Sequence, residues 1–102
     1  MKNGHVYVLR LEDGCYYIGF SQDIQVRICS HFLGAGAKWT RKHKPIEVID
    51  VKEGCTLLET LTTLVYMCRY GFEYVRGGGY TNCEMEQPAA LKKALHYKAY
   101  YK

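Results

Sequence analysis

His5-Val6-Tyr7-Val8 and, ten residues later, Cys15-Tyr16-Tyr17-Ile18-Gly19-Phe20 are the two runs that decide the fold of this chain. Both runs consist mainly of aromatic and β-branched residues, which fit the pleated, half-buried surface of a sheet. Between them, Glu12-Asp13-Gly14 has the composition of a turn. The sequence therefore predicts a β-hairpin with strands at about residues 5–11 and 15–20.

The register of this hairpin depends on its turn, and two turns fit the same residues. If Asp13-Gly14 were a two-residue turn, Tyr7 and Tyr17 would point to opposite faces of the sheet. If Glu12-Asp13-Gly14 formed a type I turn closed by a left-handed glycine, the register would shift by one residue. Only the second turn lets the two phenols meet at one site.

Composition limits the classes of function. The 102 residues suffice for one domain with one modest core. The excess of 14 Lys and Arg over 10 Asp and Glu gives a formal charge of +4, which favours a polyanionic partner. No segment approaches the roughly 20 apolar residues of a membrane span. Five cysteines without a Cys-x-x-Cys pair, and no signal peptide, predict an intracellular protein, cytoplasmic or nuclear, with free thiols.

A helix of about ten residues is predicted after the hairpin. Ser21-Gln22-Asp23 supplies capping side chains ahead of it. The apolar residues that follow recur at helical spacing: Ile24, Ile28 and Phe32. Arg27 and His31 are four residues apart, so they lie side by side on one face of this helix. The helix alone leaves Arg27 open to interpretation as a solvated surface charge.

Residues 33–45 are expected to form a loop that ends in the densest basic run of the chain. Its small residues allow close backbone approach, and its cationic side chains can neutralise phosphates. Trp39 has two open interpretations, because it can offer a stacking face to a base or plug the edge of the core. The residues of this loop expected to contact nucleic acid are Lys38, Trp39, Arg41, Lys42 and Lys44.

The second half of the chain predicts one more strand and two helices. The strand covers residues 46–51, and the helices cover about residues 56–70 and 89–101. The first of these helices has an apolar stripe made of Leu57, Leu61, Leu64, Val65 and Cys68. The last helix follows Pro88 and is expected to turn Leu91 and Leu95 inward and Lys92 and Lys93 outward.

Glu59 is the only acidic residue of the helix at 56–70. On a helical wheel it lies nearly opposite the centre of the apolar stripe, so it is not expected on the buried face. Thr56-Leu57-Leu58-Glu59 matches a capping box, in which the glutamate reaches back to the N–H of the cap residue. The sequence of this helix alone therefore does not decide whether Glu59 caps the helix or takes part in chemistry.

The order of four polar residues, separated by strand, strand, helix, strand and helix signals, resembles the GIY-YIG nuclease family over about residues 4–80. These residues are Tyr7, Tyr17, Arg27 and Glu59. Tyr17-Ile18-Gly19 is an intact second motif, whereas His5-Val6-Tyr7 stands where the family has Gly-Ile-Tyr. The resemblance selects the three-residue turn. It implies an α/β sandwich with a small, mainly antiparallel three-stranded sheet flanked by helices, in a single domain over residues 1–102.

The resemblance also implies a divalent-metal-dependent endonuclease that hydrolyses DNA phosphodiester bonds. Glu59 would hold Mg²⁺ or Mn²⁺. Tyr7 or Tyr17 would help to take the proton from the attacking water, while Arg27 stabilises the developing charge. His31 would contact phosphate or stabilise a tyrosine, unless it is a helix-face histidine satisfied by a neighbour.

Other features of the resemblance bear on activity and binding. Val75-Arg76-Gly77-Gly78 is similar to a signature in a subgroup that includes proteins of large DNA viruses, and Arg76 is expected to contact nucleic acid. An alternative alignment places the metal-binding glutamate at Leu64, and no asparagine aligns with the one that supports the site in many members. The rival hypothesis is a catalytically inactive DNA-binding module. So small a domain is expected to take its specificity from a partner protein or from a second copy of itself.

Overall fold

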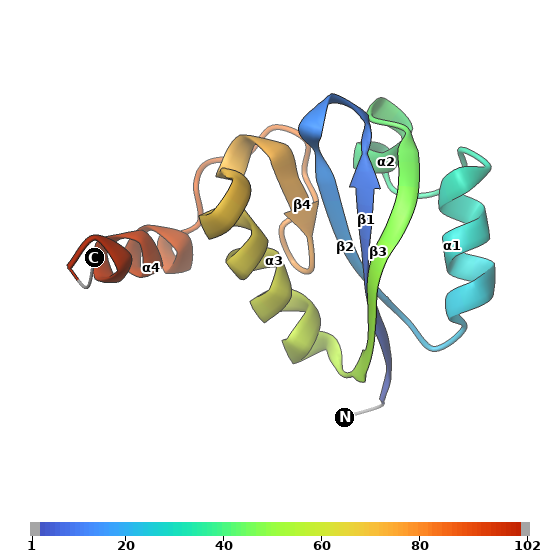
Figure 1. Ribbon diagram of the computed structural model, residues 1–102, viewed down its shortest axis with the longest axis horizontal. Helices are drawn as coiled ribbons and strands as arrows, with labels where there is room; N and C mark the ends of the chain where they lie inside the picture. Colours follow the sequence, from blue (N-terminus) through green and yellow to red (C-terminus); the bar gives the residue numbers. More distant parts are fainter. Residues whose placement is uncertain (1–2, 101–102) are drawn as a thin grey trace.

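A mixed four-stranded sheet lies between two layers of helices in the computed structural model, which describes residues 3–100 (Figure 1). The strands are β1 (Gly4–Leu11), β2 (Tyr16–Ser21), β3 (Pro45–Gly54) and β4 (Val75–Gly77), in the order β3-β1-β2-β4. β1 pairs antiparallel with β2 and β3, whereas β4 pairs parallel with β2. The α/β class is confirmed, and the predicted three-stranded antiparallel sheet is corrected to four strands in a mixed sheet.

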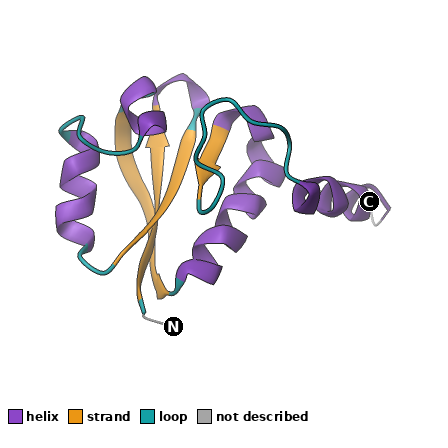
Figure 2. Ribbon diagram, turned by 180° about the vertical axis from the view of Figure 1, so that it is seen from behind, coloured by secondary structure: helices purple, strands orange, loops and turns teal. Residues whose placement is uncertain are grey.

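The helices are divided between the two faces of the sheet. α1 (Ile24–Phe32) and α2 (Lys38–Lys42) lie on one side, and α3 (Thr56–Tyr70) and α4 (Ala89–Tyr100) lie on the other (Figures 1 and 2). The basic segment predicted as a loop thus contains a short helix. The predicted end of the last helix at residue 101 lies outside the described residues. Within residues 3–100, no helix combines the length and apolar character needed to cross a bilayer.

The β1–β2 hairpin has the three-residue connection that the resemblance selected. The Leu11 N–H donates to the Cys15 carbonyl at 2.8 Å, and Glu12–Gly14 lies between them. The expected positive φ of Gly14 is confirmed at 71°. Asp13 also has a positive φ, 66°, so the expected type I turn is wrong. Asp tolerates the left-handed region, and two such residues in sequence suit the twist of a hairpin.

β4 was not predicted because it has only three residues and two of the four in its Val-Arg-Gly-Gly run are glycines. Glycine weakens the sequence signal of a strand but permits close backbone approach. Gly77 has a φ of 148°, and a Cβ at this position would overlap the Ile18 carbonyl of β2. The glycine therefore lets β4 pack directly along β2.

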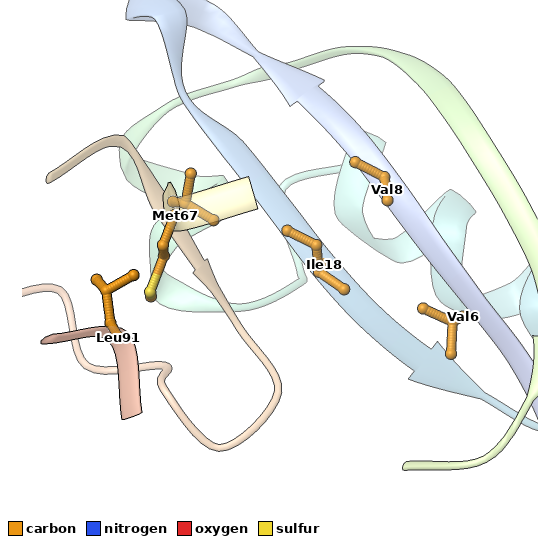
Figure 3. Close-up of a cluster of buried hydrophobic side chains, with 6 residues drawn as sticks. Val6, Val8, Ile18, Met67 and Leu91 are labelled. Atoms are coloured by element: carbon orange, nitrogen blue, oxygen red, sulfur yellow. The ribbon is translucent and has the colours of Figure 1, made fainter. Parts of the chain in front are cut away.

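Side-chain alternation along the strands creates two hydrophobic clusters. The cluster on the α3 side contains Val6, Val8, Ile18, Met67, Val75 and Leu91 (Figure 3). The cluster on the α1 side contains Tyr7, Leu9, Leu11, Cys15, Tyr17 and Trp39. Leu91 is fully buried and Leu95 packs against the first cluster, as predicted, while Lys92 and Lys93 are exposed. Tyr7 and Tyr17 thus lie on neighbouring strands and belong to the same cluster, the one on the α1 side.

β3 extends beyond the predicted residues 46–51 and forms an edge of the sheet. Its apolar side chains are largely exposed: Ile46, Val48, Ile49 and Val51. The register against β1 shifts between Val8 and Leu9 and again between Arg10 and Leu11. Such bulges twist an edge strand and discourage pairing with another chain.

α3 is rotated about its axis relative to the prediction. Thr63 and Met67 are its buried residues, and the predicted stripe is wrong for three members that are at least half exposed: Leu57, Leu61 and Val65. The inner face of α3 needs small residues because the backbone at Gly78 packs closely against it. A Cβ added at Gly78 would lie within 3.4 Å of atoms of both Thr60 and Thr63. The Thr63 hydroxyl donates to the Glu59 carbonyl at 2.8 Å, so its burial leaves no donor unpaired.

Candidate functional site

Tyr7 of β1 and Tyr17 of β2 lie on the same face of the sheet, as predicted. In the observed register Tyr7 faces Gly19 and Leu9 faces Tyr17, so the two tyrosines are diagonal neighbours. Their ring centroids are 6.5 Å apart. Both side chains are buried on the α1 side of the sheet, with 1% and 6% of their surface exposed. The three-residue turn therefore brings the two phenols together.

Gly19, the glycine of the second motif, provides space for the first tyrosine. A Cβ at Gly19 would overlap the Tyr7 hydroxyl and the ring carbon that carries it. The Tyr7 ring therefore lies directly over the backbone of the opposing strand. This packing explains why the motif needs a glycine at this position, independently of any backbone conformation.

His31 is fully buried in the last turn of α1. Its Nε2 lies 2.7 Å from the Tyr7 hydroxyl and its Nδ1 lies 2.9 Å from the Thr40 Oγ1. The ring also packs against Tyr17, with centroids 5.0 Å apart. Two of the open interpretations of His31 agree with these contacts: a histidine that stabilises a tyrosine and a histidine satisfied by its neighbours. A direct phosphate contact is not available to a side chain with no exposed surface.

Sequence reasoning missed the residues that enclose His31. Thr40 is 1% exposed, and its Oγ1 is hydrogen-bonded to the His31 Nδ1. A Cβ at Gly36 would overlap that same Nδ1 atom. The segment from Gly36 to Thr40 therefore closes over the histidine. A threonine in a basic run and a glycine in a loop gave no signal of this contact.

The inner face of α1 is defined by Ile24, Ile28 and His31, with Arg27 partly buried among them. Asp23 caps the helix by accepting from the Val26 N–H, as its sequence predicts. Phe32, which was expected on the apolar stripe, is 45% exposed. His31 takes the inward position one residue earlier because its two ring nitrogens find buried partners.

Glu59 lies on the inward side of α3, in line with Thr63 and Met67 at helical spacing. The predicted position opposite the buried face is therefore wrong. The capping box is wrong as well, because the cap residue is Cys55, which makes no side-chain cap hydrogen bond. Within the described residues, the ion pairs join Arg10 to Glu47, His43 to Asp13, and Lys52 to Asp50. The Glu59 carboxylate is left without a cationic partner there.

The electrostatics of the site link four of the predicted residues. Burial raises the pKa of Tyr7 well above the usual range, and it also raises the pKa of Tyr17. The Arg27 charge lowers the pKa of both phenols, while the Glu59 charge raises it. Arg27 and Glu59 therefore act on the same two hydroxyls. In the absence of added positive charge, both tyrosines are neutral at physiological pH.

Burial also acts on His31 and Glu59. It lowers the pKa of His31 to about 4, with a smaller contribution from the Arg27 charge, so this ring is neutral at physiological pH. Burial raises the pKa of the Glu59 carboxyl. A carboxylate that bears this desolvation without a cation of its own is suited to bind one.

The basic run has an exposed part and a buried part. Lys38, Arg41, Lys42 and Lys44 are exposed on and just after α2, where they can meet phosphates. Trp39 is 3% exposed, and its Nε1 donates to the Tyr16 carbonyl at 3.0 Å. Its inclusion among the nucleic-acid contacts is therefore corrected, and the alternative that it plugs the core holds.

Arg76 is likewise removed from the predicted nucleic-acid surface, because it is 3% exposed. Its guanidinium donates to four backbone carbonyls at 2.6–3.0 Å: those of Phe72, Val75, Asn82 and Cys83. It also packs over the rings of Trp39 and Phe72, at 4.8 and 4.6 Å from the centroids. Arg76 thus fastens the segment after β4 to the sheet, with four of its five N–H groups used inside the protein.

Glu59 is the candidate metal ligand of the site, and it is not part of a larger group of ligands in the described residues. Among residues 3–100, no three His, Cys, Asp or Glu side chains gather in an arrangement that could hold an ion. Mg²⁺ characteristically keeps several waters and binds through one or two carboxylates together with substrate phosphates. A single half-buried carboxylate such as Glu59 fits that manner of binding.

Part of the chain is similar to known proteins. The model of the GIY-YIG catalytic domain matches residues 3–64. A UPF0213 protein of Halobacterium salinarum is 48% identical over 42 residues, which are 41% of this chain and 54% of that protein. A UPF0213 protein of Bacillus pumilus is 44% identical over 46 residues, 45% of this chain and 47% of that protein.

A UPF0213 protein of Staphylococcus epidermidis is 33% identical over 61 residues, 60% of this chain and 74% of that protein. The chain spans about half the length of the Halobacterium and Bacillus relatives. No solved structure matches the chain significantly. The matched residues 3–64 include the five predicted catalytic residues: Tyr7, Tyr17, Arg27, His31 and Glu59.

Proposed function

The chain belongs to the GIY-YIG family, and on that premise we propose that it is an endonuclease that hydrolyses DNA phosphodiester bonds with a divalent metal ion. The observation that carries this proposal is that Arg27 and Glu59, from helices on opposite sides of the sheet, act electrostatically on the same pair of phenols. A cation, an anion and two hydroxyls at one place form the set that phosphodiester hydrolysis requires.

Each side chain has a role that follows from its chemistry. Arg27 stays charged at any working pH, and its planar donors meet phosphate oxygens in pairs, so it stabilises the charge that develops on phosphorus oxygens. The hydroxyl of Tyr7 or Tyr17 orients the attacking water. To take the proton of that water, the phenol must first lose its own, which the charges of Arg27 and of a bound metal ion would favour by lowering its pKa. Glu59 would hold Mg²⁺ or Mn²⁺, which when bound supplies Lewis-acid stabilisation of the phosphate.

A cleavage assay of wild type and Arg27→Ala on plasmid and branched DNA with Mn²⁺ tests this proposal. Wild type should cut, and Arg27→Ala should cut about 10²–10³-fold more slowly, because charge stabilisation in the transition state is lost. Arg69→Ala, which removes an exposed cation on α3, is the matched control and should retain its rate. If wild type binds DNA but cuts neither substrate, the inactive DNA-binding module becomes the better description, as the altered His5-Val6-Tyr7 motif suggests.

The exposed cations of the α2 segment are proposed as the DNA-binding surface. Replacing Lys38, Arg41 and Lys42 with Ala should weaken DNA affinity and flatten its dependence on salt, because fewer counterions are released. The slope of log K against log salt should decrease by about 0.9 for each phosphate that the variant no longer neutralises. Fluorescence anisotropy over a salt series measures it.

The control for this experiment removes the same charge elsewhere. Lys52, Lys92 and Lys93 are exposed on β3 and α4, and their replacement with Ala lowers the net charge equally. This variant should keep the wild-type slope. Equal slopes for wild type and the α2-segment variant would place the DNA on another surface.

A further inference from the structure

A buried chain of hydrogen bonds leads from Tyr7 away from the site. The Tyr7 hydroxyl contacts the His31 Nε2 at 2.7 Å, and the His31 Nδ1 contacts the Thr40 Oγ1 at 2.9 Å. The Thr40 Oγ1 then contacts the Ala37 carbonyl oxygen at 2.9 Å. Tyr7, His31 and Thr40 are each at most 1% exposed, so solvent does not supply alternative partners.

The donors in this chain can be assigned by counting hydrogens. The Ala37 carbonyl oxygen can only accept, so the single hydroxyl hydrogen of Thr40 must lie in that contact. The Thr40 oxygen must then accept from His31, which places a hydrogen on Nδ1. A neutral imidazole carries one N–H, so Nε2 is bare and the Tyr7 hydroxyl donates to it. No other assignment for a neutral ring puts a hydrogen into all three contacts.

We propose that Thr40 is a positioning residue of the site, which fixes His31 as the Nδ1–H tautomer and thereby points the Tyr7 hydroxyl hydrogen inward. The lone pairs of the Tyr7 oxygen then face the site, where the Arg27 charge acts on it. An oxygen in this orientation can accept a hydrogen bond from a water, and as it takes that water's proton its own hydrogen can pass to the bare Nε2 of His31, 2.7 Å away. The catalytic part of this inference depends on the proposed nuclease function, whereas the hydrogen-bond direction does not.

The surroundings of His31 hold this arrangement in place. The Thr40 hydroxyl is anchored within α2, whose Arg41 N–H also donates to the Ala37 carbonyl at 3.1 Å. Gly36 leaves room for the ring, since a Cβ there would overlap the His31 Nδ1. Without the Thr40 oxygen, an Nδ1–H would be buried with no acceptor, which costs more than moving the hydrogen to Nε2. Loss of that oxygen should therefore reverse the tautomer and the direction of the Tyr7 bond.

Nitrogen-15 NMR of the histidine rings tests the hydrogen-bond direction without any measurement of activity. Wild type and Thr40→Ser should show His31 with its hydrogen on Nδ1. In Thr40→Val the hydrogen should be on Nε2. The signals of His31 are those that disappear in His31→Asn. Thr63→Val removes another buried threonine hydroxyl that donates to a helix carbonyl, and it should leave the His31 tautomer unchanged. An Nε2–H tautomer in wild type, or the same tautomer in Thr40→Val as in wild type, would overturn the assignment.

Cleavage by the same variants tests the consequence for Tyr7. Thr40→Val should cut roughly tenfold to a hundredfold more slowly than wild type, and Thr40→Ser should restore most of the rate. A reversed tautomer with an unchanged rate would overturn the positioning role and leave the nuclease function standing. Absence of cleavage by wild type would instead contradict the proposed function, while the NMR measurement would still decide the direction of the bonds.

Discussion

Glu59→Gln is expected to reduce metal-dependent DNA cleavage by at least about 10²-fold, because the substitution removes the carboxylate that we propose holds the ion. The amide keeps the size of the side chain, so the packing of α3 should be retained. DNA affinity should stay the same or increase, since a negative charge beside the phosphate is lost. Cleavage under single-turnover conditions with Mg²⁺ or Mn²⁺, together with anisotropy for binding, measures both effects.

The stability of this variant gives an independent check. Burial raises the pKa of the Glu59 carboxyl above its ordinary value of 4.5, so the fold disfavours the ionised form. For such an acid, the contribution to stability is fully present below the unfolded-state pKa and is lost as pH rises through the folded-state pKa. Glutamine never ionises. Glu59→Gln should therefore gain stability relative to wild type as pH rises above the ordinary pKa of 4.5, as urea unfolding at several pH values would show.

Glu53→Gln is the matched control, because Glu53 is an exposed glutamate near the end of β3. It should retain wild-type cleavage and show no comparable gain in stability at neutral pH. Equal cleavage by wild type and Glu59→Gln at the same metal concentration would contradict the role of Glu59 in metal binding. A loss of folded structure in Glu59→Gln would point to a packing role.

The hairpin was predictable because its information is local. Strand propensity and the Glu12–Gly14 turn specify two strands and a short connection, and only the choice between two registers needed the family resemblance. The handedness of Asp13 was missed because the same residues suit either turn. The positions of Tyr7 and Tyr17 followed once the register was chosen.

The orientation of α3 could not be predicted from periodicity alone. Its sequence has more apolar residues than one face requires, and the face that is buried was decided by a distant contact. The backbone at Gly78 approaches Thr60 and Thr63 so closely that threonines pack there better than leucines. Because this contact turns Glu59 toward the sheet, the helical wheel placed that side chain on the wrong side.

The burial of Trp39 and Arg76 was missed for a related reason. Each residue lies in a stretch that has the composition of an exposed nucleic-acid-binding surface, and each is buried by contact with the other. The four carbonyls that satisfy Arg76 belong to a 3₁₀ turn, the three-residue strand β4 and the loop after it, and segments this short carry little pattern in sequence. The lysines next to Trp39 are exposed. The predicted basic surface is therefore present, but Trp39 is not part of it.

Gly19→Ala is expected to disturb both the fold and the site, because the new methyl group would occupy the space of the Tyr7 hydroxyl. Tyr7 cannot move easily, since it is 1% exposed and bonded to His31 at 2.7 Å. The free energy of unfolding should fall by about 1–3 kcal/mol, the usual cost of overpacking a filled core. Cleavage should fall further than stability alone explains, because the hydroxyl that remains is displaced from Arg27 and His31.

A double-mutant cycle separates this effect from the general cost of a β-strand alanine. In a Tyr7→Leu background the ring is absent, so adding Gly19→Ala should cost much less stability than it does in wild type. Gly79→Ala is the matched control, because a Cβ at Gly79 meets no atom within 4 Å and should leave stability nearly unchanged. If Gly19→Ala cost no more than Gly79→Ala in urea unfolding, the Tyr7 ring would not depend on this glycine. The motif glycine would then require a reason other than space for the tyrosine.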